Sequence, residues 1–159
     1  MNIHVGACLA VGAFGALALA VPANATSAAG IAQVCGRTLG LQPGEAHFVA
    51  CTESLTQSAQ DIRRGQMLAW ARQRCLADGD PRLAVCELRR ADEAPPVPAT
   101  VLTASGPPPR SYFLVSNAEV VRRIQEACAE VGLDPVQPAF GSCQAGLQAA
   151  LFEADNPAH

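Results

Sequence analysis

Residues 127–147, ACAEVGLDPVQPAFGSCQAGL, place two cysteines fifteen positions apart around a Gly-Leu-Asp-Pro turn. Residues 34–55, VCGRTLGLQPGEAHFVACTESL, have the same order of residues: Gly-Leu-x-Pro, Phe five positions after the Pro, Cys three after the Phe, and Leu four after the Cys. Residues 74–88, RCLADGDPRLAVCEL, form a shorter relative that keeps Cys-x3-Gly, Asp-Pro and a second cysteine. We interpret the three stretches as copies of one unit.

The unit has the periodicity of two consecutive helices. In the last copy, apolar residues recur at three- and four-residue steps on both sides of the turn, which is typical of amphipathic helices. Ser116 begins a capping box, Gly132 supplies the left-handed residue that ends the first helix, and Pro138 marks the start of the second. Asp80 and Pro81 predict the N-cap and first residue of a helix in the middle copy. The sequence therefore predicts an all-α protein of repeated helical hairpins.

Six cysteines follow the first 25 residues, and an even number in a small exported chain indicates a disulfide framework. The two cysteines of each copy fall on the apolar faces of neighbouring helices, near the turn and beside small residues. Such residues let helices approach to the roughly 6 Å Cα separation that a disulfide requires. We expect three pairs: Cys35–Cys51, Cys75–Cys86 and Cys128–Cys143. Cys35 lies one position farther from its glycine than Cys75 and Cys128 do, so the first hairpin needs a local adjustment.

The first 25 residues have the features of an export signal. An uncharged apolar run, VGACLAVGAFGALALAV at 5–21, precedes Ala23 and Ala25, which occupy the −3 and −1 positions of a small-x-small cleavage site. This pattern predicts cleavage after Ala25 and a mature chain that is periplasmic or secreted. The residues before the apolar run include no Lys or Arg. An uncleaved signal helix is therefore the alternative, and only that version would place the chain on a membrane.

The chain divides into four predicted segments: a signal peptide, an N-terminal helical part with two hairpin copies, a Pro-rich linker and a C-terminal helical hairpin. Their bounds are 1–25, 26–91, 92–111 and 112–159. Within the second segment, the apolar phase of the first copy fails near Arg63, Arg64 and Gly65. This change of phase predicts a kink or break there rather than one straight helix.

No residue pattern points to a catalytic site, a metal site or a cofactor. The closest cysteines are separated by ten residues, whereas structural zinc sites use closely spaced pairs and thiol-redox enzymes use Cys-x-x-Cys. His47 lies near Glu45 and Glu53, but Glu45 is two positions away and points elsewhere on a helix, so we interpret His47 as a surface histidine. We expect no catalytic residue, no metal and no cofactor. The alternative is a thiol-redox factor or an enzyme whose site forms between the hairpins.

Composition narrows the choice of partner. The net charge is −3 and no basic stripe is present, so a nucleic-acid partner is not expected. Arg63, Arg64 and Arg74 surround the single Trp70, and Arg and Trp are favoured at interfaces. These four residues are the candidate surface for an unknown protein or envelope partner. Solvated helix faces are the simpler interpretation, and docking of the acidic C-terminal hairpin on the Arg-rich segment is another.

The pattern Cys-x3-Gly-Leu-x-Pro…Phe-x2-Cys-x3-Leu resembles that of small, uncharacterised exported bacterial proteins with cysteine-stapled helical hairpins. The resemblance covers the C-terminal hairpin well and the first copy less well. It implies the fold and the location, and no activity. Twin Cys-x9-Cys proteins of the intermembrane space are similar in principle, but their cysteine spacings differ. The expected role is therefore non-catalytic: binding or structure in the cell envelope.

Overall fold

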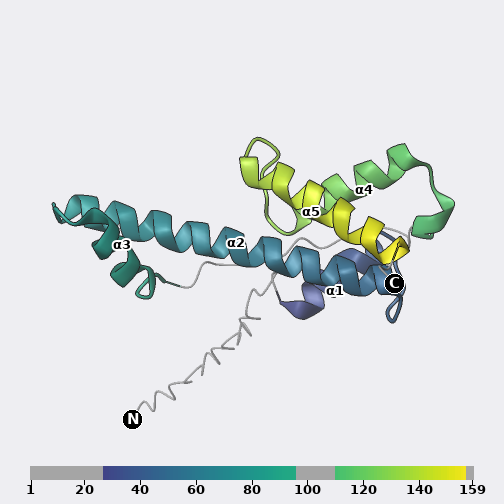
Figure 1. The fold of residues 1–159 in the computed structure, drawn as a ribbon, viewed down its shortest axis with the longest axis horizontal. Coiled ribbons are helices and arrows are strands. Elements are labelled where there is room, and N and C mark those ends of the chain that lie inside the picture. The colour runs from purple at the N-terminus through teal and green to yellow at the C-terminus, as the bar shows by residue number, and fades with distance from the viewer. Residues whose placement is uncertain (1–26, 96–109, 157–159) are drawn as a thin grey trace, which may run out of the picture.

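The computed structural model describes residues 27–95 and 110–156, and in this part of the chain every regular element is helical (Figure 1). The predicted all-α class is confirmed. The predicted signal segment and residues 96–109 of the predicted linker lie outside the described residues. The elements are α1 (Ala28–Arg37), α2 (Ala46–Ala77), α3 (Leu83–Ala91), a 3-10 turn η1 (Tyr112–Leu114), α4 (Asn117–Glu130) and α5 (Pro138–Asp155).

Three disulfides join the six cysteines in the expected pairs. The bonds link α1 to α2, α2 to α3, and α4 to α5, and in each the Cα atoms lie 6.0 Å apart. None of the six cysteines is more than 6% exposed. Each bond therefore lies inside a hairpin, and the origin of the three hairpins from one repeated unit stays a prediction.

Glycines with positive φ turn the chain between the paired helices. After α4, Gly132 has φ 93° and the amide of Leu133 donates to the carbonyl of Cys128, five residues back. After α1, the amide of Leu41 donates to the carbonyl of Cys35, six residues back. The wider turn accommodates the extra residue between Cys35 and its glycine, which is the local adjustment that the sequence predicts.

The predicted helix starts are confirmed at α4 and α5 and displaced at α3. The Ser116 hydroxyl accepts from the amide of Glu119 at 3.3 Å, and Pro138 is the first residue of α5. In the middle hairpin the helix begins at Leu83 rather than at Pro81. The Asp80 carboxylate accepts from the Arg82 amide at 2.8 Å, so it stabilises the turn before the helix instead of capping it.

The core lies where α1, the first part of α2, α4 and α5 come together, and we call this assembly the body. Leucine and isoleucine side chains from all four helices and from the turns after α1 and α4 fill it, next to two of the disulfides. Burying one such side chain contributes about 1.5–3 kcal/mol. The most deeply buried are Ile31, Leu39, Leu41, Leu55, Leu147 and Leu151.

The predicted break in α2 is wrong, because the helix continues from Ala46 to Ala77 (Figure 1). One glycine in a helix interior costs only about 1 kcal/mol, which is too little to end a helix that is packed at both ends. The apolar phase changes because the neighbour changes. Ala59 is buried against the body, whereas Ala71 and Cys75 are buried where α2 packs on α3.

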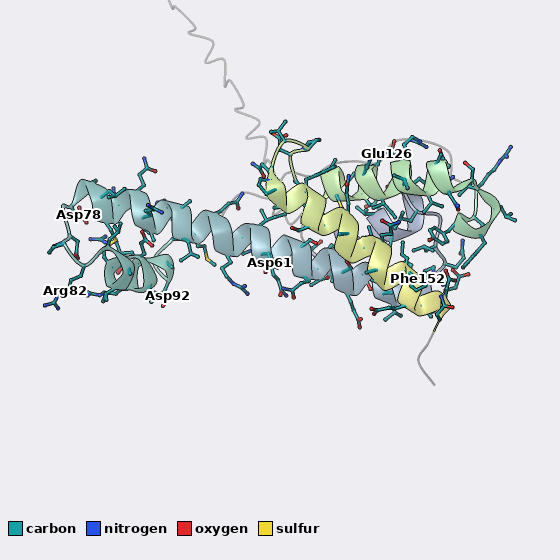
Figure 2. All side chains as sticks on the ribbon, turned by 45° about the horizontal axis from the view of Figure 1, so that its top comes forward. Asp61, Asp78, Arg82, Asp92, Glu126 and Phe152 are labelled. Carbon is teal, nitrogen blue, oxygen red and sulfur yellow. A yellow bond between two sulfur atoms is a disulfide. The ribbon has the colours of Figure 1, made fainter. Side chains whose placement is uncertain are left out.

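Residues 70–91 project from the body, and we call this part the arm (Figures 1 and 2). It consists of the last turns of α2, the following turn and α3. The arm buries only Ala71, Cys75 and Cys86, none of which belongs to the core of the body. Larger apolar side chains are exposed on it instead. Leu76, Val85 and Leu88 are 61%, 55% and 70% exposed.

Candidate functional site

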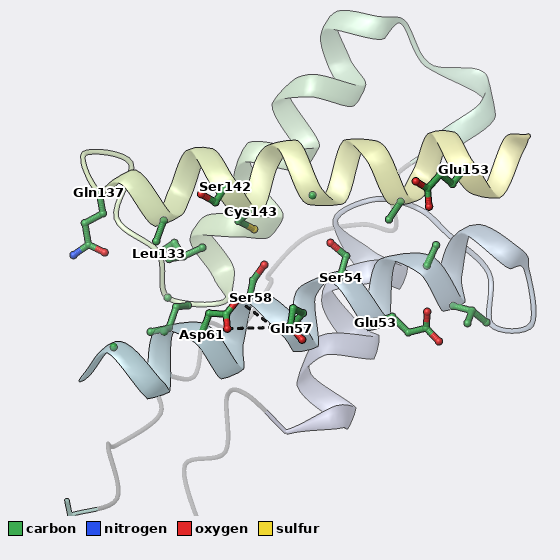
Figure 3. A pocket seen from close by; sticks show the side chains of 18 of the residues that line it. Glu53, Ser54, Gln57, Ser58, Asp61, Leu133, Gln137, Ser142, Cys143 and Glu153 are labelled. Atoms are coloured by element: carbon green, nitrogen blue, oxygen red, sulfur yellow. Dashed lines mark hydrogen bonds between the residues drawn. The ribbon is translucent and has the colours of Figure 1, made fainter. Parts of the chain in front are cut away.

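A groove of about 1270 Å³ runs between α2 and α5 (Figure 3). The α2 wall extends from Ala46 to Ala69, and the other wall extends from Gly132 to Ala154. The two helices approach closely at Gly146, where an added Cβ would lie 3.7 Å from the Ser54 hydroxyl. Many of the lining residues are Ala, Gly or Ser, so their short side chains leave the space beside this contact open.

The charged side chains that line the groove are all carboxylates. They are Glu53 and Glu153 towards one end and Asp61 towards the other (Figure 3). Asp61 accepts hydrogen bonds from Gln57 at 3.2 Å and from Arg64 at 3.3 Å. All three carboxylates are exposed, so the groove combines small side chains with negative charge. Such a surface favours a cationic, partly apolar occupant.

The structure brings together only part of the predicted partner surface. Arg63, Trp70 and Arg74 recur at steps of seven and four, so they share one face of α2. The guanidinium of Arg74 lies over the Trp70 ring, 5.9 Å from its centroid. Arg64 instead pairs with Asp61 at the groove. The use of this face by a partner stays a prediction.

The acidic C-terminal hairpin docks on α2, but it covers only the start of the Arg-rich segment. The part of α2 that lines the groove with α5 ends at Ala69, before the arm. Within the arm, Arg72 pairs with Glu87 at 3.7 Å and Arg90 with Asp78 at 2.7 Å. These arginines therefore stabilise the hairpin of α2 and α3 itself.

His47 is not a surface histidine, contrary to the prediction. It is 8% exposed, and its ring packs edge-on against Phe113 with centroids 4.9 Å apart. Its Nε2 lies 2.7 Å from Asp155 Oδ1, at the end of α5. Burial, with a smaller contribution from the Asp155 charge, raises the pKa of the neighbouring Tyr112. His47 therefore connects the start of α2 to Asp155 at the end of α5 and to Tyr112 and Phe113 of η1.

Arg123 is a second buried polar residue that the sequence reasoning missed. It is 5% exposed, and its Nη1 donates to the carbonyls of Arg110 at 2.7 Å and Leu39 at 3.3 Å. An added Cβ at Gly40 would lie 2.6 Å from the Arg110 carbonyl, so only glycine fits there. One feature of the sequence could have indicated this burial: Arg123 is next to Ile124, beside the apolar face of α4.

Two carboxyl groups on α4 have shifted pKa values. Hydrogen bonds from Arg122 and then Arg123 lower the pKa of Glu119 to about 2. Burial raises the pKa of Glu130, although Thr38 Oγ1 donates to Glu130 Oε2 at 2.6 Å and opposes that effect. The Glu130 contact joins α4 to Thr38 at the end of α1, whereas the Glu119 contacts lie within α4. Among the described residues no cluster of three His, Cys, Asp or Glu side chains could hold a metal ion.

Comparisons of the chain with protein-family models, with curated proteins and with solved structures gave no match. Across residues 27–95 and 110–156, no helix is both long enough and apolar enough to cross a membrane. The function is therefore inferred from the residues and geometry of this chain.

Proposed function

We propose that this chain is an exported, disulfide-stabilised helical protein with a binding or structural role in the cell envelope. The observation that carries the proposal is the set of three buried disulfides, one in each hairpin. Disulfides persist in oxidising compartments, and small exported domains use them where the apolar core is small. The apolar run at residues 5–21, followed by Ala23 and Ala25, supports export.

The burial of the sulfurs favours a structural role for the bonds over thiol-disulfide exchange. Exchange requires a thiolate to reach a disulfide sulfur, and reactive cysteines lie in partly exposed, electropositive surroundings. Here the six cysteines are at most 6% exposed among apolar neighbours. A bond that closes a loop of this size contributes about 3 kcal/mol. Binding then belongs to the surfaces that the hairpins present, and the groove between α2 and α5 is one of them.

Expression of the full chain in a bacterium, followed by fractionation, tests export and the disulfides together. We expect a mature protein that starts at Thr26 by N-terminal sequencing. Mass spectrometry with thiol alkylation should show no modified cysteine before reduction and six after it. A variant with Ala25→Arg is the matched control and should retain the first 25 residues.

The same experiment separates the alternatives. Free thiols in the folded protein would contradict the structural role of the disulfides. Retention of residues 1–25 in the unchanged chain would replace the exported form with a membrane-anchored one. A mixed disulfide trapped with another protein would favour the thiol-redox factor.

A further inference from the structure

The arm has an apolar outer surface with no partner among the described residues. Cys86 fixes the inner side of α3 to α2, so the opposite side carries Ala84 and Leu88 and is flanked by Val85. All three are exposed, Leu88 to 70%. An apolar surface on a projecting helical hairpin, bordered by charged residues, is typical of a protein-protein contact.

The charge of this surface complements the groove. Arg82 and Arg89 border the outer surface of α3, and neither makes an ion pair within residues 27–95 and 110–156. The groove offers the opposite charge, with Glu53, Asp61 and Glu153 and no basic residue in its walls. Its apolar lining could cover the α3 side chains. Opposite charges arranged in this way guide the register of an association.

At Gln57, the α2 wall of the groove faces the same side of α2 as Cys75, which holds the arm. Gln57 lines the groove and Cys75 holds α3, and the step of eighteen positions from one to the other makes five helical turns. The two features are therefore about 27 Å apart along one face of a continuous helix. A second copy turned by 180° about an axis perpendicular to α2, at the level of Gln66, would place each arm over the other groove.

We propose that the chain forms a reciprocal dimer in which the α3 arm of each copy docks into the α2–α5 groove of the other. The inference deepens the proposed binding role and names a second copy of this chain as the partner. In the antiparallel register, Glu53 and Gly79 lie thirteen residues on either side of Gln66, so Arg82 reaches the level of Glu53. Since α3 runs back along α2, Arg89 reaches the level of Asp61. The assembly ends at two copies, because both copies use the same two surfaces and none is left free for a third.

Sedimentation velocity on the purified, oxidised chain tests the dimer, at protein concentrations from about 1 to 200 µM. We expect dimers that weaken when NaCl is raised from about 0.05 to 0.5 M, because salt screens the charge pairs. The variants Arg82→Glu/Arg89→Glu and Glu53→Arg/Asp61→Arg should each raise the dissociation constant at least about tenfold. Mixing these two variants should restore a dimer, because one unchanged arm-groove contact re-forms and the two altered surfaces are again opposite in charge.

Three further measurements make the result specific. Gln125→Arg/Gln148→Arg changes two exposed residues outside the groove lining and should leave the dimer unchanged. Val85→Ser/Leu88→Ser should weaken it at any salt concentration, because its contribution is apolar. A photo-crosslinking residue at Gln57 should attach to peptide 79–91 of an isotopically labelled second copy.

The possible outcomes decide the proposal. A chain that stays monomeric to 200 µM, about the highest concentration tested, overturns it, as does a dimer that both charge reversals leave intact. A dimer that depends on residues 1–25, or a crosslink to a different protein in place of the second copy, also overturns it. As a control, circular dichroism and the alkylation assay on every variant test whether the fold and the disulfides are unchanged. The export experiment has its own measurements. Failure of the dimer proposal would therefore leave the proposed export unaffected, and failure of export would leave the dimer unaffected.

Discussion

A buried guanidinium joins three segments of the body that lie far apart in the sequence. Arg123 reaches the carbonyls of Leu39 and Arg110, and its Nε donates to Glu119 at 2.8 Å. The carbonyls belong to the turn after α1 and to the residue two positions before the start of η1. A single side chain on α4 thus holds both segments, and its charge is offset by Glu119 on the same helix.

Replacing Arg123 should destabilise the body far more than replacing its exposed neighbour. In Arg123→Met two carbonyls lose their charged donor inside the protein, and we expect a loss of about 3 kcal/mol in the free energy of unfolding. In Arg122→Met only exposed ion pairs are lost, and we expect less than about 1 kcal/mol. Urea unfolding of both oxidised variants measures the difference. Equal losses would show that Arg123 has no special role.

The raised pKa of Glu130 makes a prediction about pH. A carboxyl whose pKa is raised by folding binds its proton more tightly in the folded state, so the protein loses stability as pH rises through the unfolded and then the folded pKa. Glu130→Gln lacks this charge and can still accept from Thr38. We expect the variant to be more stable than the unchanged chain at pH 7, by less than about 1 kcal/mol because the carboxyl is half-exposed.

Denaturant unfolding of the unchanged chain and of Glu130→Gln measures this effect. The two are compared at pH 7 and near pH 4, which is about where free carboxyl groups titrate. The advantage of Glu130→Gln should vanish at the lower pH, where the unchanged carboxyl is protonated. A variant that is less stable at pH 7 would mean that the charge of Glu130 is favourable in the fold.

At the scale of the elements, local signals were sufficient for the hairpins and insufficient for their docking. Glycine at a positive-φ turn, proline at a helix start and cysteine at helical spacing are all short-range, so the helices and disulfides could be predicted. The continuity of α2 depends on which neighbour covers each of its halves. The pair of His47 and Asp155 joins residues 108 positions apart, and no spacing rule predicts such a contact.

The arm should depend on its disulfide more completely than the body does. With only Ala71, Cys75 and Cys86 buried, little besides the bond and exposed ion pairs holds α3 to α2. In Cys75→Ser/Cys86→Ser we expect α3 to detach while the body keeps its fold. Hydrogen exchange read by mass spectrometry should rise in residues 83–91 and stay low in α5.

The matched change in the body is Cys128→Ser/Cys143→Ser. It should instead lower the free energy of unfolding of the whole body, by about 3 kcal/mol, because α4 and α5 share one core with α1 and α2. If the arm stays protected without its bond at a concentration where the chain is monomeric, contacts within the chain other than the bond hold α3.

At the scale of the whole molecule, the chain combines one compact body with one projecting arm, and a single helix belongs to both. The body carries the groove with its carboxylates, whereas the arm carries five arginines against three carboxylates in residues 70–91. The arrangement keeps complementary surfaces apart within one copy. The arm and the groove of one chain cannot contact each other, because the continuous helix α2 holds them apart.

The C-terminal hairpin should fold only on the rest of the body. Leu147 and Leu151 are buried in the core that includes Leu55 of α2, and His47 holds the end of α5. A hairpin of two helices has too little core of its own, even with one disulfide. We expect a fragment of residues 110–159 to show weak helical circular dichroism and rapid hydrogen exchange. Mixing it with residues 27–109 should restore both, since α5 then regains α2, and a stably helical free fragment would contradict a shared core.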